Sequence, residues 1–368
     1  MTETLPRPDT SPATAPAIGG RARIRVAVVG ATGYAGGEMV RILDQHPNVR
    51  IVGLQGRGRE QEPVSISHPH LAGTGHLVDD ALPAADAVFL ALPHKLAAER
   101  AAEIVATGAR IIDQGPDFRL RDPADYPRWY GFEHPAPELL AGSVYGLPEL
   151  HRAELAALGD AETAIVGAPG CYPTATILAV APLARAGLVA DLVVDAKSGV
   201  SGAGRDPKPH LTFSEVNESV SAYGIFNHRH TAEIEQELGL LAPSGSRDAF
   251  EAVDFLPHLI PMTRGILAAA HIRPTRPVTT AELRELYRDT YAGEPFVQVM
   301  DAAPATKHVS GSNLARVFVT ADERTGRVLA VGVVDNLVKG AAGQAIQAFN
   351  VVFGLPETAG LEQLPLNP

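Results

Sequence analysis

The feature that most constrains this fold is a glycine-rich turn between an apolar run and an amphipathic segment near the start of the chain. Residues 24–29 read IRVAVV, residues 30–36 read GATGYAG, and Met39, Val40 and Leu43 then recur on one helical face. This order predicts a strand, a tight loop and a helix that ends at about Pro47. Glycines in such a loop let the backbone approach a pyrophosphate closely, and the helix N-terminus stabilises that anion. The loop therefore predicts a dinucleotide site, although a glycine turn that serves only strand-to-helix packing would look similar.

The alternation of strands and helices continues along the first half of the chain. Apolar runs at 49–54, 87–92, 109–113 and 163–167 predict further strands, with helices over about 95–107 and 174–186. This alternation indicates an α/β fold with a Rossmann-type, doubly wound parallel sheet. The charge-free stretch 163–184 is long enough to suggest a membrane span, but Pro169, Gly170 and Pro173 would break a helix there. We interpret it as strand, loop and helix.

The pattern changes in the second half, where the strands look antiparallel. Residues 316–320 and 328–334 flank the turn at 323–326, which is a hairpin signal. We predict a second, α+β catalytic and oligomerisation domain over residues 171–336. The first domain then covers residues 23–170 and is completed by residues 337–368, whose helix at 340–352 packs back on it. Residues 1–22 are proline-rich and lack apolar periodicity, which predicts a disordered tail, with a transit peptide as the weaker alternative.

Composition narrows the class of function. The net charge of −11 argues against a nucleic-acid partner, because the protein's field repels phosphate backbones. A single cysteine among 368 residues rules out an intramolecular disulfide and a cysteine zinc cluster. Residues 1–22 lack the apolar core of a secretory signal. We therefore expect a cytoplasmic protein with no membrane partner and no metal.

The end of the second predicted strand bears on the choice of cofactor. An NAD site usually offers an acidic residue there, whereas an NADP site offers arginine. Here the strand runs into QGRGR at 55–59, which favours NADP(H), with Arg57 beside the 2′-phosphate; a solvated basic loop is the alternative. The other candidate cofactor-binding residues lie in the glycine-rich loop and after the third strand: Gly30, Thr32, Gly33, Tyr34, Ala35, Gly36 and Pro93.

The lone cysteine, Cys171, stands in GAPGCYPT at 167–174, where a strand turns into a helix. The positive end of the helix should lower the pKa of the thiol and make the sulfur a nucleophile near neutrality, although a lone cysteine is often buried and inert. Beside a nicotinamide cofactor, such a sulfur suggests thioester chemistry. The best proton carriers are His228 and His230, which precede a helix in NHRHTAEIEQEL; surface histidines are the alternative.

A glycine-rich loop at 197–205, KSGVSGAGR, suggests recognition of an anion. It ends in Arg205, whose guanidinium can bind a carboxylate or phosphate with two hydrogen bonds. Ser198 and Gly199 of this loop are further candidate substrate contacts. Arg119 and Arg264 lie in other segments, and for each arginine a structural ion pair is an equal alternative.

Taken in order, these segments resemble the N-acetyl-γ-glutamyl-phosphate reductase family, NADPH-dependent enzymes of arginine biosynthesis. The match runs from about residue 23 to the C-terminus through GATGYAG, DFRL, VYGLPEL, GAPGCYPT, SGVSGAGR, HRHTAEI, PHLIPMTRGI and DNLVKGAAGQAIQ. It implies that Cys171 is the nucleophile, that His228 is the acid/base with His230 as the alternative, and that Asn336 contacts the nicotinamide. It also implies that Arg119 and Arg205 hold the substrate's phosphate and carboxylate, in an order that the sequence leaves open.

Other functions are also compatible with these motifs, and the sequence departs from the family pattern at two positions. The alternatives are a reductase of carrier-linked aminoadipyl phosphate, aspartate-semialdehyde dehydrogenase and, from another class, an NADP-binding redox sensor without chemistry. The family's usual D-L-S-A before DFR is here Asp113 to Pro116, so a serine is lost at Gly115, and Ala168 stands where the family often has Asn. The partners expected are a small acyl-phosphate substrate and further copies of the chain, as a homotetramer or homodimer.

Overall fold

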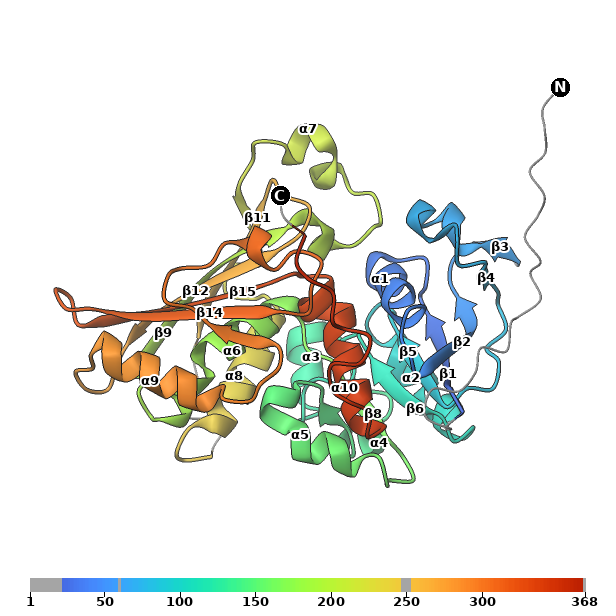
Figure 1. Ribbon diagram of the computed structural model, residues 1–368, viewed down its shortest axis with the longest axis horizontal. Helices are drawn as coiled ribbons and strands as arrows, with labels where there is room; N and C mark the ends of the chain where they lie inside the picture. Colours follow the sequence, from blue (N-terminus) through green and yellow to red (C-terminus); the bar gives the residue numbers. More distant parts are fainter. Residues whose placement is uncertain (1–21, 59–60, 246–252, 367–368) are drawn as a thin grey trace.

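The computed structural model describes residues 22–58, 61–245 and 253–366. Two β-sheets lie side by side, each with its own helices, and the C-terminal helix lies between them (Figure 1). The tail predicted at residues 1–22 falls, apart from Ala22, outside the described residues. Among the described residues, every helix is too short or too polar to cross a lipid bilayer. The stretch 163–184 forms a strand, a loop and a helix, as predicted.

The first sheet is doubly wound and parallel, which confirms the predicted fold class. Its strand order is β3-β4-β2-β1-β5-β6-β8-β7, and the pair β3–β4 is antiparallel. Alternate residues of β1 enter two different cores: Val26 and Val28 pack with α1 and α10, whereas Ala27 and Val29 pack with α2. The strands are β1 (Ile24–Val29), β2 (Val49–Gln55), β3 (Glu62–Pro63), β4 (Leu77–Val78), β5 (Ala87–Leu90), β6 (Arg110–Asp113), β7 (Val144–Tyr145) and β8 (Ile165–Gly167).

The second sheet is mixed, which corrects the antiparallel expectation. Its order is β10-β11-β9-β12-β15-β14-β13, and the pairs β11–β9 and β13–β14 are parallel because the chain crosses over through other elements before each pairing. The hairpin between β14 and β15 is confirmed. The strands are β9 (Asp191–Gly199), β10 (Ser221–Ala222), β11 (Asp254–Ile260), β12 (Ile266–Arg273), β13 (Val297–Val299), β14 (Ala315–Asp322) and β15 (Arg327–Val334).

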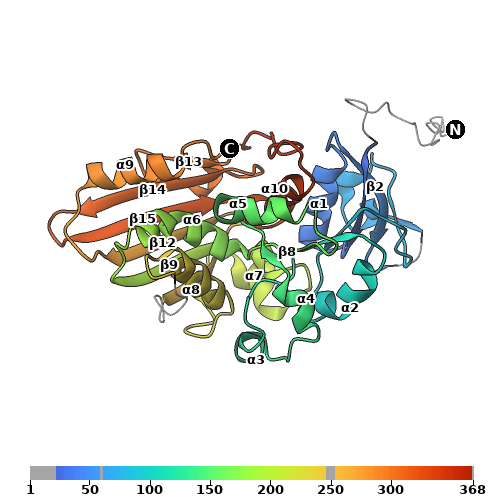
Figure 2. The same cartoon turned by 90° about the horizontal axis from the view of Figure 1, so that it is seen from below.

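Helices complete both layers (Figure 2). α6, α8 and α9 cover one face of the second sheet. The C-terminal segment begins with a π-helical turn, Val338–Ala342, and continues as α10, which packs on α5 and α1 beside the first sheet. The helices are α1 (Tyr34–Leu43), α2 (Leu96–Val105), α3 (Asp125–Tyr130), α4 (Pro137–Ala141), α5 (Pro148–Ala157), α6 (Cys171–Arg185), α7 (Phe213–Val216), α8 (His230–Leu241), α9 (Thr280–Thr290) and α10 (Gly343–Val352).

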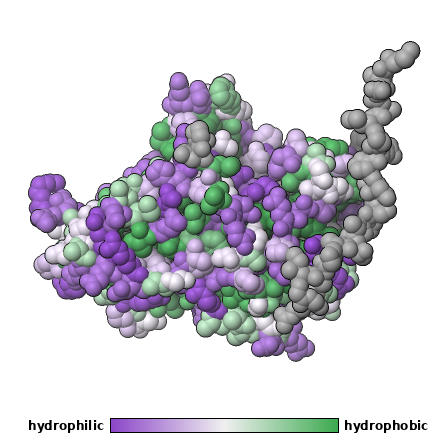
Figure 3. Space-filling model, viewed as in Figure 1, coloured by the Kyte–Doolittle hydropathy of each residue, from purple (hydrophilic) through white to green (hydrophobic). Residues whose placement is uncertain are grey.

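A segment around α7 projects from the body of the molecule (Figure 1). It connects the cavity-lining residues 201–207 to α8 and carries four exposed apolar side chains: Phe213, Val220, Ile225 and Phe226. Figure 3 shows apolar surface on this projection. Isolated exposed apolar side chains are ordinary, but four in one short segment mark a surface suited to contact with another protein.

Candidate active site

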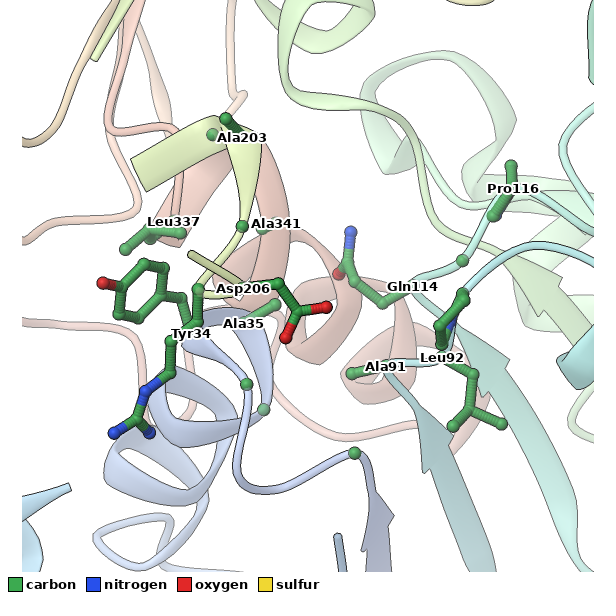
Figure 4. A pocket seen from close by; sticks show the side chains of 18 of the residues that line it. Tyr34, Ala35, Ala91, Leu92, Gln114, Pro116, Ala203, Asp206, Leu337 and Ala341 are labelled. Carbon is green, nitrogen blue, oxygen red and sulfur yellow. The ribbon is translucent and has the colours of Figure 1, made fainter. Parts of the chain in front are cut away.

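A cavity of about 850 Å³ lies between the first sheet and the loops and helices that adjoin the second sheet. Its walls come from the glycine-rich loop, the carboxyl ends of β5 and β6, the N-terminus of α6, residues 201–207, the start of α8 and the π-helical turn. Figure 4 shows Tyr34 and Ala35 on one side of this space and Ala91, Leu92 and Gln114 on the other. In open α/β sheets, ligands bind outside the carboxyl ends of the strands, and this cavity lies there.

The glycine-rich loop is built for close packing and leaves its helix end open. A Cβ added at Gly36 would lie 2.1 Å from the carbonyl oxygen of Gly30, so packing alone requires glycine at position 36. Gly33 has ordinary contacts only, and it caps α1 without a side chain from the described residues bonding to this end. The first amide groups of α1 are therefore free to bind an anion, and the first turn of α1 has no acidic residue to repel one. The loop thus fits a dinucleotide pyrophosphate.

Two arginines lie beside this loop. The backbone N–H of Arg57 donates to Thr32 Oγ1 at 3.1 Å, and its guanidinium pairs with Asp206 at 3.1 Å. Arg205 donates from Nη1 to the carbonyl oxygen of Thr32 at 2.9 Å. Arg205, which was expected to contact the substrate, is thus bonded to the glycine-rich loop in this structure. Both arginines line the cavity, as does Pro93.

Cys171 is the first residue of α6 and lines the cavity. The π-helical turn packs against it, since a Cβ added at Gly340 would lie 2.8 Å from Cβ of Cys171. Burial raises the pKa of the thiol to about 11, and the charge of Arg119 opposes this only in part. The expected lowering of this pKa by the helix N-terminus is thus wrong for the ligand-free protein, because the cost of desolvating a thiolate outweighs the helix field. The sulfur needs a proton acceptor.

The structure separates the two histidines that the sequence left open. His230, the first residue of α8, lines the cavity, and its Nε2 would lie 2.6 Å from a Cβ added at Gly170, next to Cys171. His228 lies behind it, with the ring centroids 4.7 Å apart, and packs on Tyr172, Tyr223 and Phe255 away from the cavity lining. Burial lowers the pKa of His228 to about 4 and that of His230 well below its usual range. Both rings are therefore neutral near pH 7, and His230 is the one that shares the cavity lining with Cys171.

A buried carboxylate, Glu233, ties these elements together. It accepts hydrogen bonds from Arg119 Nη1 at 3.1 Å, the Tyr145 hydroxyl at 2.8 Å and the Gly170 N–H at 2.9 Å. It also lies 3.9 Å from Nε2 of His230, one helical turn earlier. Glu233 thus fixes the loop before Cys171 and faces the imidazole. Glu233 was not among the residues expected from the sequence; its spacing of three residues from His230 is the signal that could have identified it.

Arg119 lines the cavity while it is held by the protein. Its Nε donates to Ala168 O at 2.7 Å and its Nη2 to Gln114 O at 2.7 Å, in addition to the bond to Glu233. A guanidinium has five N–H groups, so two remain for a ligand. This fixed arginine is suited to binding a phosphate or carboxylate next to Cys171.

Four of the predicted residues are held away from the cavity or occupied by the protein. Ser198 and Gly199 are buried in β9 and do not line the cavity. Arg264 pairs with Glu38 at 3.0 Å and Asp335 at 3.5 Å, outside the cavity lining, so its role here is a structural ion pair between the two halves. Asn336 lines the cavity, but its Oδ1 accepts from Gly265 N and its Nδ2 donates to Ser201 Oγ.

The two departures from the family pattern lie next to each other around Asp113. Gly115 lines the cavity, and a Cβ there would lie 2.9 Å from Asp113 Oδ1 and 3.2 Å from Leu92 O, so a side chain at this position would crowd Asp113. Ala168 is fully buried and donates its N–H to Asp113 O at 2.7 Å. The backbone thus holds the cysteine loop at this point. Within the described ranges, no three His, Cys, Asp or Glu side chains group closely enough to hold a metal ion.

Comparison with known proteins gives consistent matches. Residues 25–158 match the family model for the semialdehyde dehydrogenase NAD binding domain, and residues 171–336 match its dimerisation domain. The N-acetyl-gamma-glutamyl-phosphate reductase of Heliobacterium modesticaldum is 48% identical over 357 residues, which cover 94% of this chain and 100% of the relative. The enzyme of the same name from Symbiobacterium thermophilum is 49% identical over 348 residues, covering 92% and 97%.

Among solved structures, aspartate semialdehyde dehydrogenase with NADP from Candida albicans superposes with a TM-score of 0.67. The identity is 14%, and the match covers 92% of this chain and 99% of that one. Aspartate semialdehyde dehydrogenase II of Vibrio cholerae gives 0.66 at 17% identity, covering 90% and 98%. At such identities the likeness shows the fold alone.

Proposed function

The chain belongs to the N-acetyl-gamma-glutamyl-phosphate reductase family of semialdehyde dehydrogenases, and from this premise we propose the reaction that it catalyses. It reduces N-acetyl-gamma-glutamyl phosphate to N-acetylglutamate semialdehyde and phosphate, with NADPH, in arginine biosynthesis. The observation that carries the proposal is the meeting of Cys171, His230 and Arg119 around Glu233, at the wall of the cavity that the glycine-rich loop also lines.

A nicotinamide cofactor would bind in the cavity, at the N-terminus of α1, and supply the hydride. The uncapped N-terminus of α1 would hold its pyrophosphate. Arg57 would bind the 2′-phosphate of NADP. Arg205, which donates a hydrogen bond to the carbonyl oxygen of Thr32, would add positive charge at the same end of the cavity. Asp206 now occupies the guanidinium of Arg57, so this ion pair would open when the phosphate binds.

Cys171 would act as the nucleophile, with His230 as its base. The thiol proton passes to Nε2 of His230 as sulfur bonds to the γ-carbonyl carbon, and the bond from carbon to the phosphate oxygen breaks. After reduction of the thioester, the thiohemiacetal expels the sulfur as the aldehyde forms, and His230 returns the proton to sulfur. Glu233 lies where it would stabilise the imidazolium. We therefore propose His230 rather than His228 as the acid/base, because His230 lines the cavity and faces Glu233.

Arg119 would neutralise the leaving phosphate. Its guanidinium is fixed beside the loop of Cys171 by three protein contacts, so it would pay little conformational entropy when it binds the anion. The free amide groups at the N-terminus of α6, which has no acidic residue in its first turn, would stabilise the developing oxyanion.

We further propose that residues 23–170 with 337–368 form the NADP-binding domain and that 171–336 form the catalytic and oligomerisation domain. The matched dimerisation model and the apolar projection around α7 support a homodimer or homotetramer. The chain would work in the cytoplasm, where its single thiol stays reduced.

Replacing Cys171 with Ser tests the proposed reaction. The variant should bind NADPH like the wild type and lose reductase activity, which is measured most easily as phosphate-dependent oxidation of N-acetylglutamate semialdehyde. Strong residual turnover in the variant would refute the covalent scheme. A wild-type protein that prefers a carrier-linked substrate over the free N-acetylated one would refute the assignment of substrate.

A further inference from the structure

One buried amide oxygen in the cavity has no hydrogen-bond partner among the described residues. Gln114, which carries this oxygen as Oε1, follows β6 and is 9% exposed. It lines the cavity, and Figure 4 shows its amide end directed into that space. Buried side-chain polar atoms nearly always have a partner, so an unpaired one needs an explanation. A polar group of a ligand in the cavity supplies that explanation.

The backbone of Gln114 fixes where this amide lies. Its N–H donates to Leu90 O at 2.8 Å, which places it at the end of β5. Its carbonyl accepts from Arg119 at 2.7 Å, and the same guanidinium bonds Ala168 in the loop of Cys171. Gln114 is thus joined by its backbone to the end of β5 and, through Arg119, to the loop before Cys171, and all three of these segments line the cavity. A hydride donor must occupy this cavity if it is to reach a carbon atom bonded to the sulfur of Cys171.

Asn336, the residue expected to contact the nicotinamide, is already engaged. Its oxygen accepts from Gly265 N at 2.7 Å, and its nitrogen donates to Ser201 Oγ at 2.9 Å. Of these two amides in the cavity lining, that of Asn336 is hydrogen-bonded within the protein through both its oxygen and its nitrogen. The oxygen of the Gln114 amide has no partner among the described residues.

We propose that the side-chain amide of Gln114 binds the carboxamide of the nicotinamide ring. Each group carries one N–H₂ donor and one carbonyl acceptor, so the two are complementary. The contact would select the orientation of the ring against Cys171. This inference rests on the proposed function only in requiring a nicotinamide cofactor.

The test compares two ligands on the full chain carrying Gln114→Met. NADP⁺ contains the nicotinamide, whereas 2′-phospho-ADP-ribose has the same adenosine, pyrophosphate and ribose without it. By calorimetry, the variant should bind NADP⁺ about tenfold more weakly, which corresponds to roughly 1.4 kcal/mol, and bind 2′-phospho-ADP-ribose unchanged. Its urea midpoint should equal that of the wild type, because both backbone hydrogen bonds remain.

Gln55→Met is the matched control. Gln55 also lines the cavity, but its amide is bonded to Asp80 O and Arg100, so its loss should not discriminate between the two ligands. Equal affinity of wild type and Gln114→Met for NADP⁺, or equal weakening of both ligands, would overturn the inference. A rise in KM for the acyl phosphate with NADP⁺ binding unchanged would also overturn it. A wild-type chain that fails to bind NADP⁺ would overturn the proposed function itself.

Discussion

The state of the Cys171 thiol in the ligand-free protein can be measured directly, because it is the only cysteine in the chain. Burial raises its pKa from 9.0 to about 11. At pH 8 the thiolate fraction is then about 0.1%, against about 10% for the same group at pKa 9. Since the thiolate is the reactive form, alkylation by neutral iodoacetamide should be about 100-fold slower in the folded protein than in urea.

The assay follows the mass of the single adduct with time between pH 7 and 10. The logarithm of the rate in the folded protein should rise linearly, by about one per pH unit, without levelling off. The slope of the logarithm of the rate against pH reports the pKa of the thiol. The absolute rate does not report it as cleanly, because restricted access slows the reaction equally at every pH. A rate that levels off below pH 9 would refute the reasoning and restore the helix N-terminus as the dominant influence on this thiol.

Three further predictions concern charged or titratable groups. His230→Asn should lower kcat by roughly 100- to 10,000-fold and His228→Asn by less than about tenfold; the reverse order in steady-state kinetics would contradict the choice of base. Arg57→Gln should weaken NADPH binding by roughly 10- to 100-fold and leave NADH binding unchanged, and equal effects on both would exclude a 2′-phosphate contact. Burial alone would raise the pKa of Glu38, but hydrogen bonds from Arg264 and Arg41 lower this pKa from 4.5 to about 2. Glu38→Gln should therefore lower the free energy of unfolding at pH 7 by about 3 kcal/mol. This stabilisation is complete above pH 4.5 and is lost as the pH falls toward 2, so urea unfolding at pH 3.5 should show a difference of only about 2 kcal/mol; a difference independent of pH would contradict the assignment.

Local patterns were enough to predict the five longer strands of the first sheet, because each apolar run is continuous in sequence, whereas the two-residue strands β3, β4 and β7 were not predicted. The glycine-rich loop, the helix after Cys171 and the hairpin at the end of the second sheet were predicted for the same reason. The parallel pairs β11–β9 and β13–β14 were missed because strand direction depends on connections through distant segments, which periodicity does not record.

The candidate site likewise has features that the sequence indicated and features that depend on tertiary contacts. Residue types and motifs indicated Cys171, the two histidines and Arg119. The pKa values and hydrogen-bond partners of these residues depend on burial, which the motifs do not record. The pKa of the thiol, the choice between His228 and His230 and the unpaired amide of Gln114 all depend on which groups surround each side chain. Arg264 was assigned to substrate because its partner, Glu38, lies 226 residues away in sequence.

α10 shares one apolar cluster with β1, although the two elements lie far apart in the sequence. Ile346 and Phe349 belong to the same apolar cluster as Val26 and Val28, so the first sheet lacks part of its interior until the segment that contains α10 has been synthesised. The π-helical turn that touches Cys171 belongs to this late segment as well. A chain that lacks these residues would therefore leave the pocket around Cys171 incomplete.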